Sequence, residues 1–120
     1  MRELKCFRAW LRHEKRFEYF SIGDWGKIKY IQEFENEVNQ WTGLKDKQGK
    51  DIYEGDICNA KTFTGNYKGV ISFISGCFVL EIFQSDNIEY DVGQVPDLCD
   101  FEEIMIVGNI YENSELLKGD

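Results

Sequence analysis

The sequence is poor in the residues on which most enzyme sites depend. It has one histidine, His13, and one proline, Pro96, among 120 residues. Nucleophilic serine and cysteine sites usually rely on a histidine base. His13 lies in the charged segment RHEKR, which is typical of a solvent-exposed turn between two strands. We therefore expect His13 to be a turn residue and the protein to have no enzyme activity.

Long apolar runs and closely spaced cysteines are also missing. No run approaches the roughly 18–20 apolar residues that a membrane helix needs, and the start MRELKCFRAWLRHEKR lacks the apolar core of a signal peptide. We expect a cytoplasmic protein with no membrane partner.

The cysteines lie 52, 19 and 22 residues apart, unlike the ligands of a structural zinc site. We expect no metal or cofactor, and free, slowly reacting thiols, because three cysteines lie within or beside apolar runs: Cys58, Cys77 and Cys99.

Charge is unevenly distributed along the chain. The formal net charge is −8, yet residues 1–16 carry six cations against two glutamates, and residues 81–120 carry eleven carboxylates against one lysine. The acidic total repels polyanions, so we do not expect nucleic acid to be the main partner. Solvated faces are the simplest interpretation. A basic protein partner and head-to-tail self-association into a homo-oligomer stay open as alternatives.

One segment nevertheless favours nucleic-acid binding as an alternative function. In FRAWLRHEKR cations interleave with aromatic residues, and small barrels bind single strands with cations and stacking aromatics. The candidate binding residues are Arg8, Trp10, Arg12 and Arg16. A small β protein also needs aromatic residues for its core, so this function ranks below a noncatalytic protein-interaction module.

Short strand-length runs alternate with turn signals along the whole chain. ICNAKTF, YKGVISFI and FVLEIF are each followed by a turn signal, and KIKYIQEF alternates with a period of two. We predict one mainly β domain over residues 1–120. It consists of an N-terminal β-meander (about 1–41), a small, partly open, SH3-like barrel of short antiparallel strands (about 42–112), and a short C-terminal helical turn capped by Asn113. The apolar IMIV (104–107) predicts a central strand, and Gly108 predicts a bulge or corner.

The stretch TGLKDKQGKDIYEGD contains three glycines that predict tight corners. Asp46 and Gly49 occupy the first and fourth places of a type I turn. Gly55 relieves the backbone before the next strand, where Asp56 can accept hydrogen bonds from neighbouring amides. A phosphate-binding loop is the functional alternative, but it leads into a helix. Here strand-like segments follow, so we interpret the glycines as structural.

Carboxylates are close enough in sequence to suggest Mg²⁺ binding or acid–base chemistry. With 22 acidic residues in 120, such neighbours are expected by chance. We therefore assign no catalytic or metal-binding role to the closest groups, which are Glu102 with Glu103, Asp97 with Asp100, and Asp86 with Glu89 and Asp91.

Four motifs in order, FRAW, TGLKDKQGKDIYEGDI, KGVISFISGCFVL and IVGNIYENSELL, span the chain from about Lys5 to Leu117. Together they resemble the YopX family of small bacteriophage and prophage proteins. The resemblance implies a phage-encoded, cytosolic, mainly β protein whose biochemical role is uncharacterised, with no catalytic residues to carry over. With the absences above, it favours a noncatalytic interaction module that acts on an unknown phage or host protein.

Overall fold

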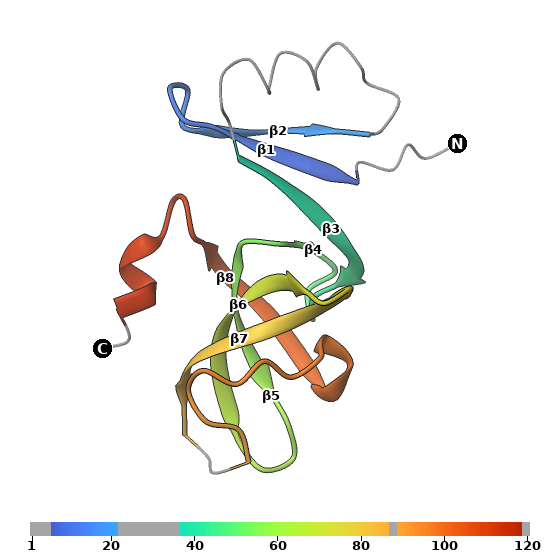
Figure 1. Ribbon diagram of the computed structural model, residues 1–120, viewed down its shortest axis with the longest axis vertical. Coiled ribbons are helices and arrows are strands. Elements are labelled where there is room, and N and C mark those ends of the chain that lie inside the picture. Colours follow the sequence, from blue (N-terminus) through green and yellow to red (C-terminus); the bar gives the residue numbers. More distant parts are fainter. Residues whose placement is uncertain (1–5, 22–36, 87–88, 119–120) are drawn as a thin grey trace. The chain divides into compact units, whose positions relative to one another are not determined.

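The computed structural model describes residues 6–21, 37–86 and 89–118, and they form the mainly β structure that the sequence predicts (Figure 1). The strand predicted in KIKYIQEF (27–34) lies outside the described residues. Contacts divide the chain into two units, 1–41 and 42–120, which are described separately below. Neither short 3-10 helix in the described ranges has the length or apolar character of a membrane-spanning helix.

The first unit contains an antiparallel sheet in which β1 lies between β2 and the start of β3. The strands are β1 (Phe7–Leu11), β2 (Arg16–Phe20) and β3 (Glu37–Lys45). The β1–β2 turn closes where the Lys15 amide donates to the Leu11 carbonyl at 2.7 Å. Ala9 and Phe20 are buried, and Phe7 stacks on Phe20 with ring centroids 5.6 Å apart. This small apolar cluster holds the unit together.

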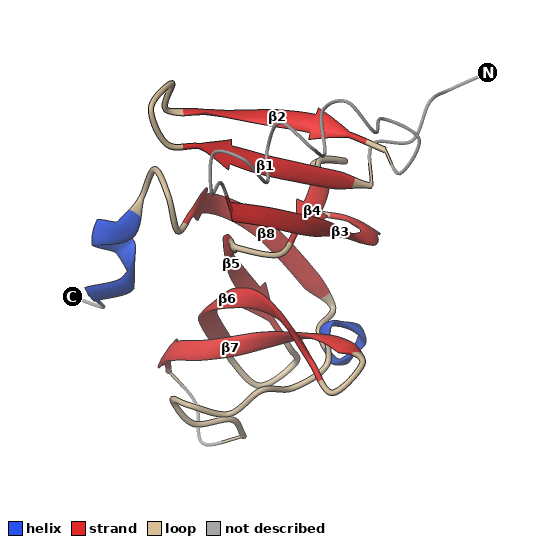
Figure 2. Ribbon diagram, turned by 45° about the horizontal axis from the view of Figure 1, so that its top comes forward, coloured by secondary structure: helices blue, strands red, loops and turns tan. Residues whose placement is uncertain are grey.

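The second unit is built around a curled sheet with the strand order β7-β6-β5-β8 (Figure 2). Its strands are β5 (Asp56–Lys61), β6 (Asn66–Ile74), β7 (Cys77–Ser85) and β8 (Glu103–Asn109). A short β4 (Asp51–Tyr53) pairs with the end of β3. Alternation along β5 buries Cys58 and Ala60 and exposes Asn59 and Lys61. The buried core is Ile52, Cys58, Ala60, Tyr67, Ile71, Leu80, Ile82, Leu98 and Phe101.

The prediction that IMIV lies in a central strand is wrong, because β8 is an edge of its sheet. The outer side of β8 is covered by a loop instead of another strand. The Lys47 amide donates to the Ile104 carbonyl at 2.9 Å, and the Asp46 carboxylate accepts from the Ile106 amide at 3.0 Å. The loop thus pairs backbone groups on the outer side of β8 that would otherwise be open, while the apolar side chains of IMIV are only half-buried or exposed.

The predicted bulge at the end of β8 is confirmed. Ile57 pairs with Gly108 and Cys58 pairs with Ile106, so one residue of β8 is left over between them. An added Cβ at Gly108 would come within 2.7 Å of the Asn113 side chain. The backbone of β8 therefore approaches Asn113 as closely as only glycine allows.

The predicted terminal helical turn is present as η2 (Ser114–Lys118), but Asn113 has a different role from the one predicted. Its Oδ1 accepts a hydrogen bond from the Asn109 amide at 3.1 Å, and its backbone carbonyl accepts from the Leu116 amide at 2.9 Å. The side chain thus closes the turn after β8, and it is the main chain that starts the helix.

The long loop after β7 folds back along the outer edge of that strand. The Leu80 amide donates to the Pro96 carbonyl and the Ile82 amide to the Gln94 carbonyl, both at 3.0 Å. The loop then enters η1 (Leu98–Asp100), in which Leu98 is buried. Both edges of the curled sheet are therefore covered by irregular chain, which leaves few backbone groups open to edge-to-edge pairing.

Candidate functional site

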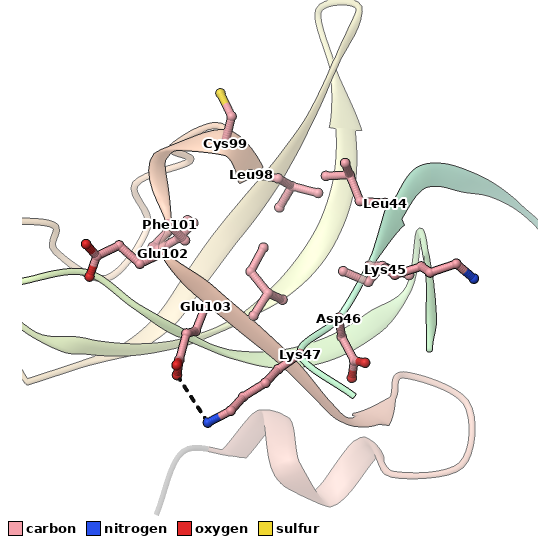
Figure 3. A pocket seen from close by; sticks show the side chains of 11 residues that line it. Leu44, Lys45, Asp46, Lys47, Leu98, Cys99, Phe101, Glu102 and Glu103 are labelled. Atoms are coloured by element: carbon pink, nitrogen blue, oxygen red, sulfur yellow. Dashed lines mark ion pairs between the residues drawn. The ribbon is translucent and has the colours of Figure 1, made fainter. Parts of the chain in front are cut away.

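A groove of about 380 Å³ opens in the second unit, between the end of β3 and the segment that leads into β8 (Figure 3). Core side chains form its apolar part: Ile52, Leu98 and Phe101. Leu44 adds an apolar side chain that is 44% exposed, and Figure 3 shows it pointing toward Leu98. The full lining is Leu44, Lys45, Asp46, Lys47, Ile52, Leu98, Cys99, Phe101, Glu102, Glu103 and Ile104.

The rim of the groove is charged. Lys47 Nζ lies 3.5 Å from Glu103 Oε2 (Figure 3), and Lys45 Nζ lies 2.9 Å from Asp51 Oδ1. Both pairs are largely solvent-exposed, so each contributes little to stability. Glu102 is exposed beside them and makes no ion pair within the described ranges. An apolar floor with a charged rim is the usual composition of a protein-binding surface.

Asp46 organises the wall between β3 and β8. Its Oδ1 accepts from the amides of Gln48 and Lys50, both at 2.9 Å, and its Oδ2 accepts from the Ile106 amide at 3.0 Å. Burial alone would raise the pKa of Asp46, but hydrogen bonds from the Ile106, Lys50 and Gln48 amides and the Lys50 charge outweigh it. The pKa of this carboxyl therefore lies below its ordinary value of 3.8.

The turn that holds Asp46 is the one that the sequence predicts. The Gly49 amide donates to the Asp46 carbonyl at 2.9 Å, and Gly49 has φ +83°. At the next corner Gly55 has φ +85°, and the Tyr53 amide donates to Asp56 Oδ2 at 2.8 Å. The glycines of this stretch thus shape one wall of the groove through backbone geometry, and the residues between them supply lining side chains such as Leu44 and Ile52.

Three of the acidic residues singled out in the sequence accept contacts from their neighbours: Asp86, Glu89 and Glu103. Asp86 accepts from the Asn66 amide at 2.7 Å, and this bond and one from the Asn66 side chain hold the pKa of Asp86 below its ordinary value. Glu103 faces Lys47. Across the described part of the chain, no three His, Cys, Asp or Glu side chains gather closely enough to hold a metal ion.

The candidate binding residues of the first unit lie in different environments. Arg8 is only 4% exposed, its Nε donates to Asn39 Oδ1 at 3.2 Å, and its guanidinium lies 4.1 Å from the centre of the Phe17 ring. Trp10 is half-buried and packs edge-on against the same ring at 5.0 Å. The structure therefore brings Arg8 and Trp10 together, around a Phe17 ring that is itself half-buried.

The two other candidates lie at the β1–β2 turn. Arg16 is half-exposed between two carboxylates, 3.1 Å from Glu14 and 2.7 Å from Glu18. Arg12 is exposed in the turn, next to the exposed His13. Arg16 thus contributes less positive field than its sequence position suggests, because two carboxylates compensate it.

Sequence reasoning did not find the groove, because its apolar residues come from segments far apart in the chain. One signal was available: Leu44 is the single apolar residue in the polar stretch TGLKDKQGK. A large apolar side chain in a polar stretch is either part of the core or available to a partner on the surface. Leu44 lines the groove and is still half-exposed, so part of its side chain remains available to a partner.

The comparisons with known proteins concern nearly the whole chain. A family model described as "YopX protein" matches residues 12–118. No curated protein matches the chain. The crystal structure of protein EF1440 from Enterococcus faecalis is similar, with 26% sequence identity and a TM-score of 0.59, over 93% of this chain and 96% of that one. The fold described above therefore has an experimentally determined relative.

Proposed function

We propose, since the chain belongs to the YopX family, that it is a noncatalytic protein-interaction module encoded by a bacteriophage or prophage. It acts in the cytoplasm of the bacterial host on a phage or host protein. Family membership supports the phage association. The single observation that carries the interaction role is the groove of the second unit, with its apolar floor and charged rim.

The groove suits a partner segment that inserts one apolar side chain. Leu44 and Leu98 flank the opening, and Phe101 adds a further apolar side chain to the lining. Burial of one leucine or phenylalanine side chain contributes about 1.5–3 kcal/mol. That is enough for an anchor residue, and the remaining affinity must come from the polar rim.

The charges of the second unit favour a basic partner. Residues 42–120 carry six lysines and fifteen carboxylates, a formal net charge of −9. Between residues 86 and 103 there are seven carboxylates and no lysine or arginine, and Glu102 brings this acidic segment to the rim. A partner segment with a lysine or arginine beside its apolar anchor is therefore attracted, and acidic competitors are repelled.

The chemistry of Asp46 supports a binding role over catalysis. A general base needs a pKa near the working pH and a free lone pair directed at its substrate. The pKa of Asp46 lies below 3.8, and its two carboxylate oxygens accept from three backbone amides. The buried carboxylate beside the groove is thus committed to holding the wall.

Nucleic-acid binding by the first unit remains the second candidate, with weaker support. Contacts within the unit engage Arg8 and Trp10, both against the Phe17 ring, and Arg16, between Glu14 and Glu18. Single-strand binding depends on exposed cations and exposed aromatic faces. The protein-interaction role is therefore the better supported of the two.

Selection from a library of random peptides displayed on phage tests the proposed function. Binders to the wild-type protein are counter-selected against the Leu44→Glu variant, which places a charge at the mouth of the groove. We expect enriched peptides that share an aromatic or aliphatic residue next to lysine or arginine, and that lose at least tenfold in affinity for Leu44→Glu. Enriched peptides that bind both proteins equally, or no enrichment at all, would refute the groove as the interaction site.

A further inference from the structure

We propose that the partner of the groove is a second copy of this chain, whose Phe63 enters it. This inference rests on the proposed function and names the ligand of the same site. It would make the protein self-associate head to tail, with the tip of the β5–β6 hairpin of one copy in the groove of the next.

Phe63 is the most exposed large apolar residue in the described ranges, at 94%. It lies at the tip between β5 and β6, in a loop closed by a hydrogen bond from the Thr62 amide to the Gly65 carbonyl at 3.0 Å. A single exposed aromatic residue is not unusual in itself. The unusual feature is how firmly the chain on both sides of Phe63 is held.

One carboxylate holds the loop from both sides of the aromatic residue. Thr62 Oγ1 and Thr64 Oγ1 donate to Glu89 Oε1 at 3.0 and 2.9 Å, and the two hydroxyls lie 3.1 Å apart. The base of the hairpin is fixed as well, because the Asn66 amide donates to Asp86 at 2.7 Å. The loop is thus ordered before any partner arrives, which lowers the entropic cost of binding.

Phe63 and Lys61 supply the apolar and the cationic group that the groove requires, beside two carboxylates, Glu89 and Asp86, that accept hydrogen bonds from the hairpin. Lys61 precedes Phe63 by two positions, is exposed, and makes no ion pair within the part of the chain that the structure describes. The groove offers Glu102, an exposed carboxylate that likewise has no ion pair there. An apolar anchor next to a lysine on one copy therefore meets an apolar floor next to a glutamate on another.

The tip residue Phe63 does not line the groove of its own unit, so the proposed contact joins two different sites. The Glu102 amide donates to the Lys61 carbonyl at 2.8 Å, so the two residues are neighbours in the sheet. The Lys61 side chain lines a neighbouring depression of about 200 Å³ with Asn59 and Asn66. This depression shares Lys47 and Glu103 with the groove, whereas Glu102 lines only the groove. A contact between two different sites is heterologous. Repeated from one copy to the next, it produces either a closed ring or an open filament.

The contact is expected to be weak. One phenylalanine buries about 150–250 Å², and stable interfaces bury on the order of 1,200–2,000 Å² in total. Each copy also carries a net charge of −8, which opposes close approach. Association should therefore depend on concentration and be sensitive to the loss of a single anchor.

Sedimentation velocity of the full chain tests the proposal. The wild-type weight-average mass should rise over roughly a hundredfold increase in concentration, as mass action requires. Phe63→Ser and Leu44→Glu should each remain monomeric over the same range. The control Val92→Ser removes another exposed apolar side chain (64%) and should behave as wild type. Melting temperatures within about 2 °C of wild type confirm that the variants are folded, because exposed positions tolerate substitution.

Mixing the two monomeric variants gives the decisive result. Phe63→Ser keeps an intact groove and Leu44→Glu keeps an intact tip, so an equimolar mixture should form a dimer and nothing larger. A mixture that stays monomeric while the wild type associates would overturn the proposal, as would a wild type that is monomeric throughout. If self-association fails but selected peptides still bind in a Leu44-dependent way, the proposed interaction function is supported. The partner is then a protein other than a second copy of this chain.

Discussion

The Asp46 carboxylate accepts a hydrogen bond from the Ile106 amide at 3.0 Å, across 60 positions of the sequence. This contact ties the glycine-rich turn to the outer edge of β8 and holds one wall of the groove. The same carboxylate also accepts two amides of its own turn. One side chain therefore couples local chain reversal to the placement of a distant strand.

Replacement of Asp46 by alanine should destabilise the protein strongly. Three backbone amides lose a charged acceptor, and the Ile106 amide is left facing the groove wall without one. Hydrogen bonds to charged groups contribute about 1.5–3 kcal/mol each but are not additive, so we expect a loss of about 2–4 kcal/mol in urea unfolding. Asp51→Ala, which removes only the exposed pair with Lys45, should cost less than about 1 kcal/mol.

Stability should decrease in acid partly because of Asp46. Its folded pKa is below the ordinary value of 3.8, so the contribution is fully present above that value and is lost as the pH falls through the folded pKa. The free-energy difference between wild type and Asp46→Asn should therefore be largest above about pH 4 and shrink toward pH 2. A difference that stays constant over this range in urea titrations would mean that Asp46 is not the titrating group.

Substitution of Gly49 should act through backbone conformation alone. Gly49 has φ +83°, and an added Cβ would meet no atom within 4 Å. Gly49→Val should lower the free energy of unfolding by about 1–3 kcal/mol, because branched residues rarely adopt positive φ. Gly49→Asn should cost clearly less, since asparagine tolerates this region. Equal melting temperatures for the two variants would contradict the assignment of the turn.

The cysteines should separate into fast and slow thiols, which corrects the expectation of uniformly slow reaction. Cys77 and Cys99 are exposed, Cys6 is half-buried and Cys58 is fully buried. Mass spectrometry of the folded protein after brief treatment with a maleimide should show two rapid additions, at Cys77 and Cys99. Cys58 should react only after unfolding, because reaction requires access as well as thiolate. Rapid labelling of Cys58 would show that the core opens readily.

The first unit should not hold single-stranded DNA at physiological ionic strength. Arg8 is buried and Arg16 lies between Glu14 and Glu18. Any weak binding at low salt should fall with a log–log slope of about −0.7 per neutralised phosphate. Fluorescence anisotropy with a labelled oligonucleotide, at low salt and at physiological ionic strength, measures how the affinity depends on salt. Submicromolar binding that survives at the higher salt and disappears in an Arg12→Glu, Arg16→Glu double variant would reverse the ranking of the two functions.

Much of the local structure was predictable because it depends on neighbours in the chain. Gly49 and Gly55 have positive φ at the predicted corners, whereas Gly43, which also has positive φ, lies within β3 and makes no corner. The bulge at Gly108 and the terminal helical turn also followed from nearby residues. Exposure was predicted less well, because Cys77 and Cys99 lie beside apolar runs and yet face solvent.

The sequence by itself determined the mainly β class, the corners and the family, because period-two alternation, positive-φ glycines and motif order are all local properties of the chain. Only the tertiary structure decided that β8 is an edge strand, that Asp46 reaches Ile106, and that Leu44 meets Leu98 across a groove. These relationships join residues tens of positions apart. Their formation depends on which strands pair and in what register, and the same short-range pattern is compatible with several such pairings.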